Sequence, residues 1–162
     1  MGTILIGIGD YGASKTPGDI VKTMALGSCV AVIFLVPKTR CVGMVHIALP
    51  ESKIDLSKGT AKPGHFADTG IPALLEEVRR VGGAVMMSEI FVKIAGGANV
   101  LGSSSTFDIG RRNVLAVKKK LWQMGTGPVA EDVEGHFSRT VTVDVSSGTI
   151  ELSSPAKGKW IL

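Results

Sequence analysis

The chain has 162 residues, of which 44% are hydrophobic, and its formal net charge is +4. This length favours a single domain over residues 1–162, whose core forms without disulfides or metal. The longest apolar run, Cys29–Val36, is far shorter than the ~18 residues of a membrane span. The first residues have no basic region followed by a long apolar one, so we expect no signal peptide and a cytoplasmic protein.

An apolar strand is predicted over residues 3–8, followed by a loop. Gly7, Gly9 and Gly12 have the spacing of a dinucleotide-binding fingerprint in that loop. The fingerprint requires a helix whose N-terminus holds the pyrophosphate. Pro17 and Gly18 follow instead, with no helical period, so we exclude nucleotide binding here.

The clearest hairpin joins strands over residues 29–36 and 41–49, with Pro37 in its turn. Residues 50–65 form a polar segment rich in Gly, Pro and Lys, for which we predict a mobile loop. A helix is then predicted over 68–83, capped by Asp68 or Thr69. Its apolar stripe consists of Ile71, Leu74, Leu75, Val78 and Val81.

The second half continues with a strand and a Gly-rich turn over residues 88–99 and a helix over 108–125, for which Asp108 is the expected cap. A terminal hairpin is predicted over 138–154 from alternating valines around a Ser-Ser-Gly turn. Strands outnumber helices, and several strands are apolar on both faces. The pattern predicts an α+β fold with sheets covered on both sides.

The one concentration of positive charge lies on the second predicted helix. Arg111 and Arg112 precede Lys118 and Lys119 by seven residues, so the four side chains share one stripe. A solvated helix face is the first interpretation, and contact with an acidic protein partner is the alternative. Few aromatic residues accompany this charge, so we expect no nucleic-acid partner.

The predicted hairpin brings Cys29 close to His46. If the chain turns symmetrically about residues 37 and 38, the numbers of paired residues sum to 75, and Cys29 lies opposite His46. Directly opposed residues have Cβ atoms about 4.5–5.5 Å apart on one face of the sheet. The same rule pairs Cys41 with Phe34 on the other face, so the two thiols should not share a site. Cys41 is interpreted as a small buried hydrophobic residue.

Two chemical interpretations of this pair remain on spacing alone. A core cysteine beside a hydrogen-bonded histidine is one, and a nucleophile with its base is the other. An imidazolium beside Cys29 would stabilise the thiolate, and His46 could then protonate a leaving amine. Gly27 and Ser28 precede Cys29 in a tight turn that can direct backbone N–H groups at an oxyanion. The short ligand spacings of zinc sites are absent, so no metal is expected.

Several segments decide between these interpretations by their likeness to a known family. The stretches "TMALGSCVAV", "GMVHIALPES", "KPGHFADTGI", "KIAGGANV", "IGRRN" and "AEDVEG" resemble, in order and spacing, the CheD family of chemoreceptor glutamine deamidases. The resemblance covers residues 4 to about 152. It implies a cysteine hydrolase with a β-sandwich of mixed or antiparallel sheets flanked by helices, similar in fold to cytotoxic necrotizing factor toxins, and no cofactor.

By position, the resemblance implies that Cys29 is the nucleophile, His46 the base and acid, and Thr23 the third catalytic member. Two positions depart from the family pattern. Ala25 stands where the family often has Gly, and Glu134 stands in place of the first Gly of a Gly-Gly pair.

The resemblance also implies a set of activities and partners. The expected substrates are the cytoplasmic helices of chemoreceptors, met at a shallow, open site, and the same chemistry would hydrolyse glutamate methyl esters. We expect a monomer without membrane insertion. The alternative function is a mainly non-catalytic binding partner of a CheC-like phosphatase of the response regulator. A cysteine amidase for small molecules is a third interpretation, and it would require a deep pocket.

Overall fold

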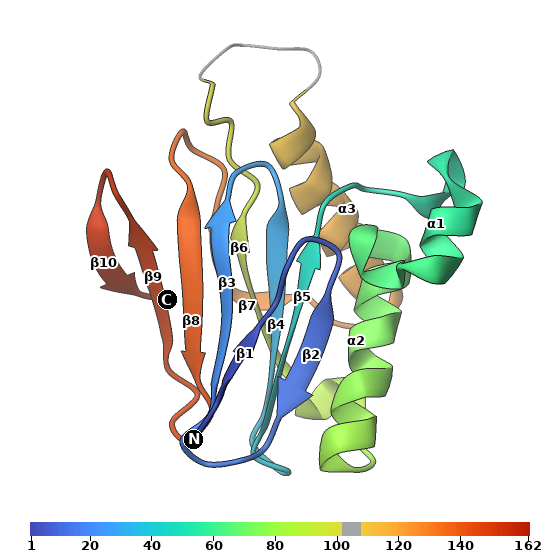
Figure 1. Cartoon of the computed structure of the whole chain (residues 1–162). Coiled ribbons are helices and arrows are strands. Elements are labelled where there is room, and N and C mark those ends of the chain that lie inside the picture. The colour runs from blue at the N-terminus through green and yellow to red at the C-terminus, as the bar shows by residue number, and fades with distance from the viewer. Residues whose placement is uncertain (102–107) are drawn as a thin grey trace.

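The computed structural model describes residues 1–101 and 108–162 as a stack of three layers. Two five-stranded sheets pack face to face, and helices cover the far side of one of them (Figure 1). We call the sheet with strand order β1-β3-β8-β9-β10 the outer sheet, and the sheet with order β2-β5-β4-β6-β7 the middle sheet. The strands are β1 (Thr3–Leu5), β2 (Tyr11–Ser14), β3 (Ile20–Leu26), β4 (Val30–Val36), β5 (Cys41–Ile47), β6 (Phe91–Gly96), β7 (Pro128–Val133), β8 (Arg139–Asp144), β9 (Ile150–Ser154) and β10 (Gly158–Ile161).

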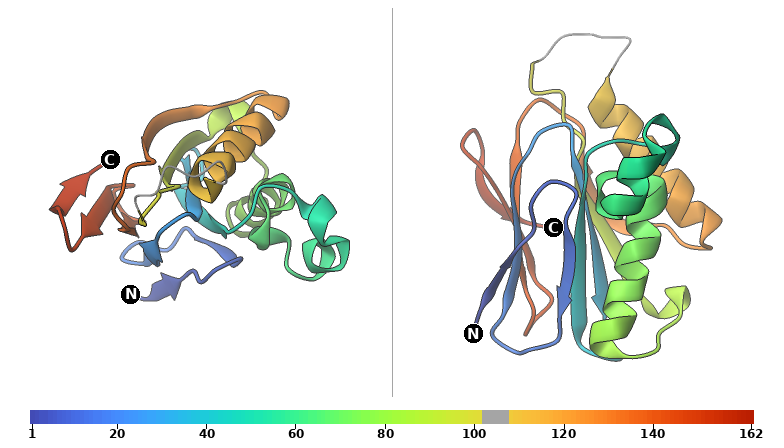
Figure 2. Two further views of the ribbon diagram at one scale, coloured as in Figure 1. Left: turned by 90° about the horizontal axis from the view of Figure 1, so that it is seen from above. Right: turned by 45° about the vertical axis from the view of Figure 1, so that its right-hand side comes forward.

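The middle sheet is apolar on both faces because it is packed on both sides. In β4, residues with even numbers such as Val32 and Phe34 face the helices, and residues with odd numbers such as Ala31 and Ile33 face the outer sheet. Successive side chains of a strand point to opposite faces, so one apolar strand feeds two cores. The predicted α+β class is confirmed, as are the two sheets flanked by helices. The helices cover only the middle sheet among the described residues, so the expectation of sheets covered on both sides is wrong for the outer sheet (Figure 2).

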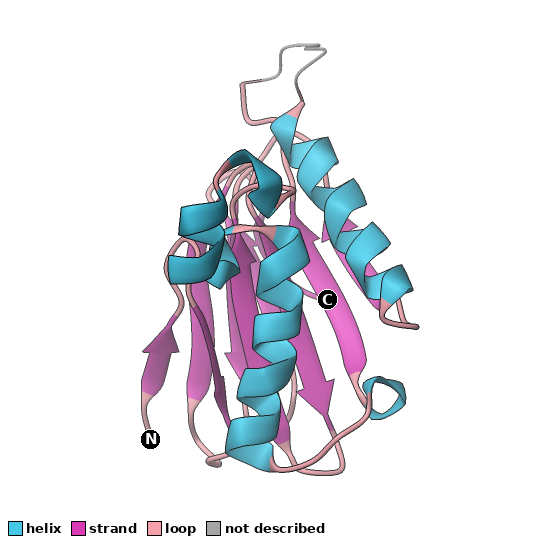
Figure 3. Ribbon diagram, turned by 90° about the vertical axis from the view of Figure 1, so that its right-hand side faces the viewer, coloured by secondary structure: helices cyan, strands magenta, loops and turns pink. Residues whose placement is uncertain are grey.

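The two long helices lie next to each other on the middle sheet (Figure 3). In α2 (Ala67–Gly82) the predicted apolar stripe is buried from Ile71 to Val78. Neither predicted cap of α2 is correct, because the helix begins one residue earlier after Phe66. Asp68 accepts hydrogen bonds from Ser52 instead, and the Thr69 hydroxyl donates to the Pro63 carbonyl.

The second helix, α3 (Ile109–Gln123), begins as predicted. The Asp108 carboxylate accepts a hydrogen bond from the N–H of Arg111. The segment predicted as a mobile loop contains the short helix α1 (Leu56–Ala61) between two 3-10 turns, Ser52–Ile54 and Pro63–His65. Its Gly and Pro residues mark the ends of these short turns.

Four strands were not expected from the sequence, namely β2, β3, β7 and β10. They are edge strands or carry polar residues, so their apolar alternation is weak. The predicted hairpins β4–β5 and β8–β9 are confirmed. In the part of the chain that is described, no helix is long and apolar enough to span a membrane.

The register predicted for the β4–β5 hairpin is wrong by two residues. Val36 pairs with Cys41 and Ala31 pairs with His46, so paired numbers sum to 77 rather than 75. The physical reason is the turn, which uses four residues, 37–40, and places Arg40 in a left-handed conformation with φ of 61°. A shift of two residues keeps every side chain on its predicted face. Cys29 and His46 therefore share a face, although they are not directly opposed.

Candidate active site

Two predicted site residues, Thr23 and His46, are in contact between the two sheets, and the third, Cys29, lies in the turn that joins the sheets. Thr23 belongs to β3 of the outer sheet, and His46 belongs to β5 of the middle sheet. Cys29 lies in the turn that carries the chain from β3 across to β4. Thr23 and His46 are buried, and Cys29 is partly exposed and packs against the core between the sheets. The site is thus built from both sheets and lies at one end of their interface.

An irregularity in β3 redirects the chain just before this turn. The pairing of β3 with β8 shifts between Thr23 and Leu26, which leaves Met24 and Ala25 outside the regular register. Ala25 has a φ of 54°, in the left-handed region that an L side chain disfavours. Bulges of this kind increase the bend of a strand and change where its side chains point. Here the irregularity separates the inward-facing Thr23 from the turn that holds Cys29.

The Thr23 hydroxyl fixes which nitrogen of His46 carries the proton. Thr23 Oγ1 lies 2.6 Å from the Ile6 carbonyl oxygen and 2.7 Å from His46 Nδ1. A hydroxyl has one proton to donate, and the Ile6 carbonyl can only accept. The Thr23 proton therefore goes to Ile6, and His46 Nδ1–H donates to Thr23 Oγ1. This arrangement leaves His46 Nε2 unprotonated, with a lone pair that can accept a proton.

The Cys29 thiol lies on the same side of the middle sheet as His46. Cys29 is two residues before Ala31, the direct partner of His46, and packs with the residues of β4 that face the outer sheet. Within residues 1–101 and 108–162, no hydrogen bond joins the Cys29 thiol to the imidazole. Catalytic hydrogen bonds are often long in the absence of substrate and shorten when it binds.

Burial favours the neutral forms of both groups. Desolvation raises the pKa of the Cys29 thiol above its ordinary value of 9.0. Desolvation also lowers the pKa of His46 to about 4, against a smaller opposing effect from the Asp10 carboxylate. At neutral pH the free protein therefore holds a thiol and a neutral imidazole, rather than the thiolate–imidazolium pair expected from the sequence.

Hydrogen bonds to the carbonyl oxygens of the turn fix the orientation of its peptide groups. Its carbonyl oxygens accept hydrogen bonds from the protein: Gly27 from the Ala98 N–H, Ser28 from Asn113 Nδ2, and Cys29 from the Gly97 N–H. In a trans peptide the N–H points opposite to the preceding C=O. Since the Gly27 and Ser28 carbonyls point toward Ala98 and Asn113, the N–H groups of Ser28 and Cys29 point away from these two donors. Two such N–H groups are suited to bind an oxyanion.

Asn113 of α3 links the two halves of the site. Its side chain is fully buried, and Nδ2 donates to the Ser28 carbonyl at 2.9 Å and to the Ala48 carbonyl at 3.0 Å. One amide group therefore connects the Cys29 turn to the end of β5, two residues after His46. Sequence reasoning gave Asn113 no role, although it lies in the "IGRRN" segment. Only the fold brings it to residues 85 and 65 positions away.

Gly96 allows the backbone to approach the Cys29 turn closely. Gly96 has a φ of 113°, and a Cβ added there would overlap the Cys29 carbonyl oxygen. The Gly-Gly doublet of "KIAGGANV" signalled this close approach in the sequence. The same carbonyl-rich region is held by Arg139, whose buried guanidinium donates to the Glu134 carbonyl and pairs with Asp132 at 2.7 Å.

The two departures from the family pattern both lie at positions with positive φ. Glu134 has a φ of 66°, and its N–H donates to the Gly96 carbonyl at 2.9 Å. Its side chain extends outward, with Oε1 3.9 Å from Nε of Arg111. The charge of Glu134 is therefore accommodated at the surface, and its backbone keeps the close approach that glycine would allow.

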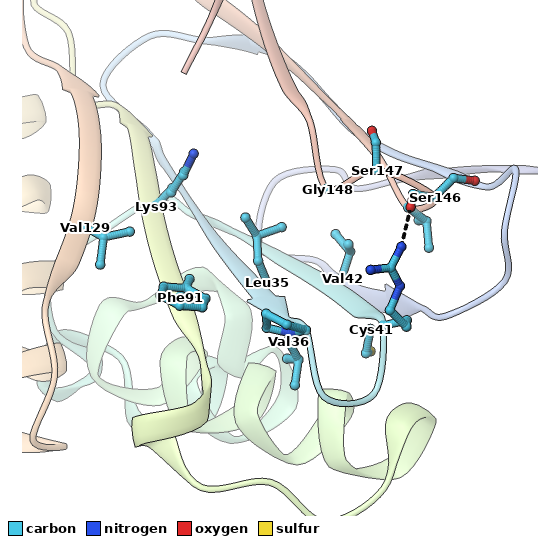
Figure 4. A pocket seen from close by; sticks show the side chains of 13 residues that line it. Leu35, Val36, Cys41, Val42, Phe91, Lys93, Val129, Ser146, Ser147 and Gly148 are labelled. Carbon is cyan, nitrogen blue, oxygen red and sulfur yellow. Dashed lines mark hydrogen bonds between the residues drawn. The ribbon is translucent and has the colours of Figure 1, made fainter.

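A cavity of about 340 Å³ lies at the opposite end of the sheets (Figure 4). The β4–β5 turn and the β8–β9 turn enclose it, and Arg40 donates to the Ser146 carbonyl across its wall. Cys41 lines this cavity at 1% exposure, and burial raises the pKa of its thiol to about 11. The interpretation of Cys41 as a buried hydrophobic residue is confirmed. In the described part of the chain, no group of three or more His, Cys, Asp or Glu side chains could hold a metal ion.

Comparison with known proteins gives a consistent set of relatives. A family model described as "CheD chemotactic sensory transduction" matches residues 48–154. The "Probable chemoreceptor glutamine deamidase CheD" of Syntrophotalea carbinolica is 52% identical and covers 99% of both chains. The "Chemoreceptor glutamine deamidase CheD" of Thermotoga maritima is 42% identical over 97% of this chain and 95% of its own. The family model begins after His46, whereas these relatives align over almost the whole chain.

Proposed function

The chain belongs to the CheD family, and we propose that it is a protein-glutamine deamidase that converts glutamine side chains of chemoreceptors to glutamate, with Cys29 as nucleophile, His46 as base and acid, and Thr23 as positioning residue. One observation carries the assignment of roles. Because Thr23 passes its proton to Ile6, it accepts from His46 Nδ1–H and leaves Nε2 as the basic nitrogen.

The first half of the proposed reaction forms a thioester. His46 Nε2 takes the proton of the Cys29 thiol as Sγ attacks the side-chain carbonyl carbon of glutamine. The N–H groups of Ser28 and Cys29 stabilise the oxyanion of the tetrahedral intermediate. The C–N bond then breaks, and the imidazolium returns the proton to the leaving nitrogen, which departs as ammonia.

The second half releases glutamate. His46 Nε2 takes a proton from water, and the hydroxide attacks the thioester carbonyl at the same oxyanion site. The C–S bond breaks, the product is a glutamate side chain, and the proton on His46 returns to Cys29. One water is consumed and one ammonia released for each glutamine, so the cycle needs no cofactor. A glutamate methyl ester would react through the same thioester, which supports an additional methylesterase activity.

The neutral resting state is compatible with this sequence of steps. A thiol with a raised pKa and an imidazole with a lowered pKa exchange a proton only as attack begins. Substrate binding would exclude water and bring the carbonyl carbon between the two groups, and Thr23 stabilises the imidazolium by accepting from Nδ1. Thr23 carries no charge, so it contributes less than an aspartate in its place would.

The test is incubation of the purified protein with the cytoplasmic domain of a chemoreceptor. Ammonia release and peptide mass spectrometry report deamidation at individual glutamines. We expect the wild type to be active, Cys29→Ala to be inert, and Cys41→Ala to retain activity as the matched control. Full turnover by Cys29→Ala would refute the nucleophile assignment.

The remaining expectations about context stay predictions. They are a single CheD-like domain over residues 1–162, a cytoplasmic location, a monomeric state and association with a CheC-like phosphatase. Size-exclusion chromatography with light scattering tests the monomer. A mainly non-catalytic binding role is not favoured, because binding alone gives no reason to place a buried Thr–His hydrogen bond beside a partly exposed thiol.

A further inference from the structure

A surface groove lies along α3, on the helix side of the middle sheet, at the end of that sheet where the Cys29 turn is found. It lies between α3 and residues 49–54, and its volume is about 470 Å³. We propose that this groove, called the α3 groove below, docks the substrate protein through an amphipathic helix that carries acidic side chains. The inference rests on the proposed function, since the occupant is the deamidation substrate.

The α3 groove begins near the backbone of the turn that carries the proposed nucleophile, whose thiol lies on the other side of the middle sheet. Asn113 of α3 binds the carbonyls of Ser28 and Ala48, and the next residue, Leu49, already lines the groove. Ile109 and Arg112, which flank Asn113 on α3, line the opposite wall. A helix in the groove would therefore lie at the same end of the middle sheet as the thiol, and a folded substrate protein could contact both at once.

The floor of the groove is apolar and open to solvent. Ile54 is 64% exposed on one side, and Leu115 is 58% exposed on the other. Helix α3 buries one apolar face, with Val114, Val117 and Leu121, against the sheet. Leu115 does not belong to that face. An amphipathic helix of a monomeric protein needs one apolar face, whereas α3 has a second one with no described element over it.

The rim of the groove is basic. Arg112 and Lys119 follow the same line of α3 as Leu115, and both are exposed. Across the groove, Lys53 pairs with Glu51 at 2.9 Å, so those two charges cancel. The groove therefore has a net positive charge, which attracts an acidic segment. Lys118, the residue before Lys119, pairs with Glu131 of β7 and does not add to the positive charge of the groove.

The walls of the groove favour a helix over an extended peptide. They are a helix and a 3-10 turn, and neither presents the open sheet edge to which an extended peptide adds as a strand. A helix satisfies its own backbone hydrogen bonds and needs only an apolar floor. From Ile109 to Lys119 the wall is about 15 Å long at 1.5 Å per residue, which accommodates roughly ten residues of a helix.

Kinetics on a chemoreceptor cytoplasmic fragment test the docking. The groove variants are Leu115→Ser and Lys119→Glu. The matched controls are Val129→Ser, which is equally exposed near the opposite end of the sheets, and Lys15→Glu. We expect KM for the fragment to rise about tenfold or more in each groove variant with kcat within about twofold, and both constants to stay within about twofold in the controls. Higher salt should raise KM in the wild type and have less effect in Lys119→Glu.

Two further measurements separate docking from catalysis. The rate of Cys29 alkylation by iodoacetamide should be the same in groove variants and wild type, because the groove does not touch the thiol. The Kd of the inactive Cys29→Ala protein for the fragment should rise when Leu115→Ser is added. An unchanged Kd, or a fall in kcat without a change in KM, would overturn the docking inference. Absence of deamidation by the wild type would overturn the proposed function alone, since the Kd comparison still tests the groove.

Discussion

Replacing Thr23 by valine tests the hydrogen-bond arrangement on which the proposed mechanism depends. Valine keeps the shape of threonine and removes only the hydroxyl. In the folded protein this hydroxyl is completely buried, donates to Ile6 at 2.6 Å and accepts from His46 at 2.7 Å. The substitution therefore leaves a buried carbonyl and a buried Nδ1–H without partners, while the packing around residue 23 is preserved.

The expected effects follow from those two unpaired groups. Each buried polar group left without a partner costs about 1–3 kcal/mol, so Thr23→Val should lower the free energy of unfolding by roughly 2–6 kcal/mol. The imidazole also loses the contact that fixes its tautomer and orientation. Since Thr23 stabilises the imidazolium without a charge, we expect kcat to fall about 10- to 100-fold rather than more.

The assay combines denaturation, kinetics and the tautomer itself. Urea unfolding gives the stability change, and ammonia release from a receptor fragment gives kcat. Nitrogen-15 chemical shifts of the His46 ring report which nitrogen is protonated, and the wild type should show the Nδ1–H form. Thr23→Ser is the control, because it keeps the hydroxyl and loses one methyl group, at a cost of about 1 kcal/mol.

Two results would refute the reasoning. An Nε2–H tautomer in the wild type would mean that His46 presents its protonated nitrogen to the thiol. A Thr23→Val protein with kcat within about threefold of wild type, alongside an active Thr23→Ser, would mean that the hydroxyl has only a structural role.

Four other expectations follow from the same site. The pKa of His46 is about 4 in the folded protein and 6.5 ordinarily, so the unfolded chain binds more protons than the folded protein between these pH values. The free energy of unfolding should therefore fall by about 3 kcal/mol as the pH falls from 6.5 to 4. In His46→Gln, urea denaturation over the same pH range should not show this loss. Because burial raises the pKa of Cys29, its alkylation rate should still be increasing at pH 9, and a plateau below pH 7 would contradict the neutral resting thiol. Ala25→Gly should stabilise the fold by about 1 kcal/mol in urea unfolding, because Ala25 has a positive φ; a destabilised variant would count against strain at the bulge. Asn113→Asp places a carboxylate against two carbonyl oxygens, so we expect the free energy of unfolding to fall by about 3 kcal/mol or more and deamidase activity to be lost. A variant as stable as the wild type would disprove the bridging role of Asn113.

Some elements of the fold could be predicted from the sequence and others could not, for physical reasons. Helix α2 was predictable because its buried residues recur at helical spacing, and β4 because an uninterrupted apolar run marks a strand covered on both faces. The N-cap of α2 could not be predicted, because the Asp68 carboxylate accepts a hydrogen bond from Ser52, a residue that only tertiary packing brings close. The strands β7 and β10 lie at sheet edges, where polar residues are tolerated and the alternation fades.

The site shows the same division. The Cys29 and His46 positions came from a local hairpin and a resemblance, whereas Asn113 and the Ile6 carbonyl are contributed by segments distant in the chain. No periodicity or spacing connects residue 113 to residue 28, so the bridge could be found only in the fold. The Gly-Gly doublet at 96–97 was visible in the sequence, but which backbone it approaches was not.

The error in the hairpin register explains why the site prediction was still useful. An error of one residue would have moved His46 to the face of the helices, away from both Thr23 and Cys29. The actual error was two residues, because a two-residue turn was expected and four residues form it. Whether two side chains share a face of the sheet depends on whether the register shift is odd or even, whereas the distance between them depends on the size of the shift. The sequence could therefore place the thiol and the imidazole on one surface, but their separation, and with it the neutral resting pair, depends on the turn at residues 37–40 and on burial between the two sheets.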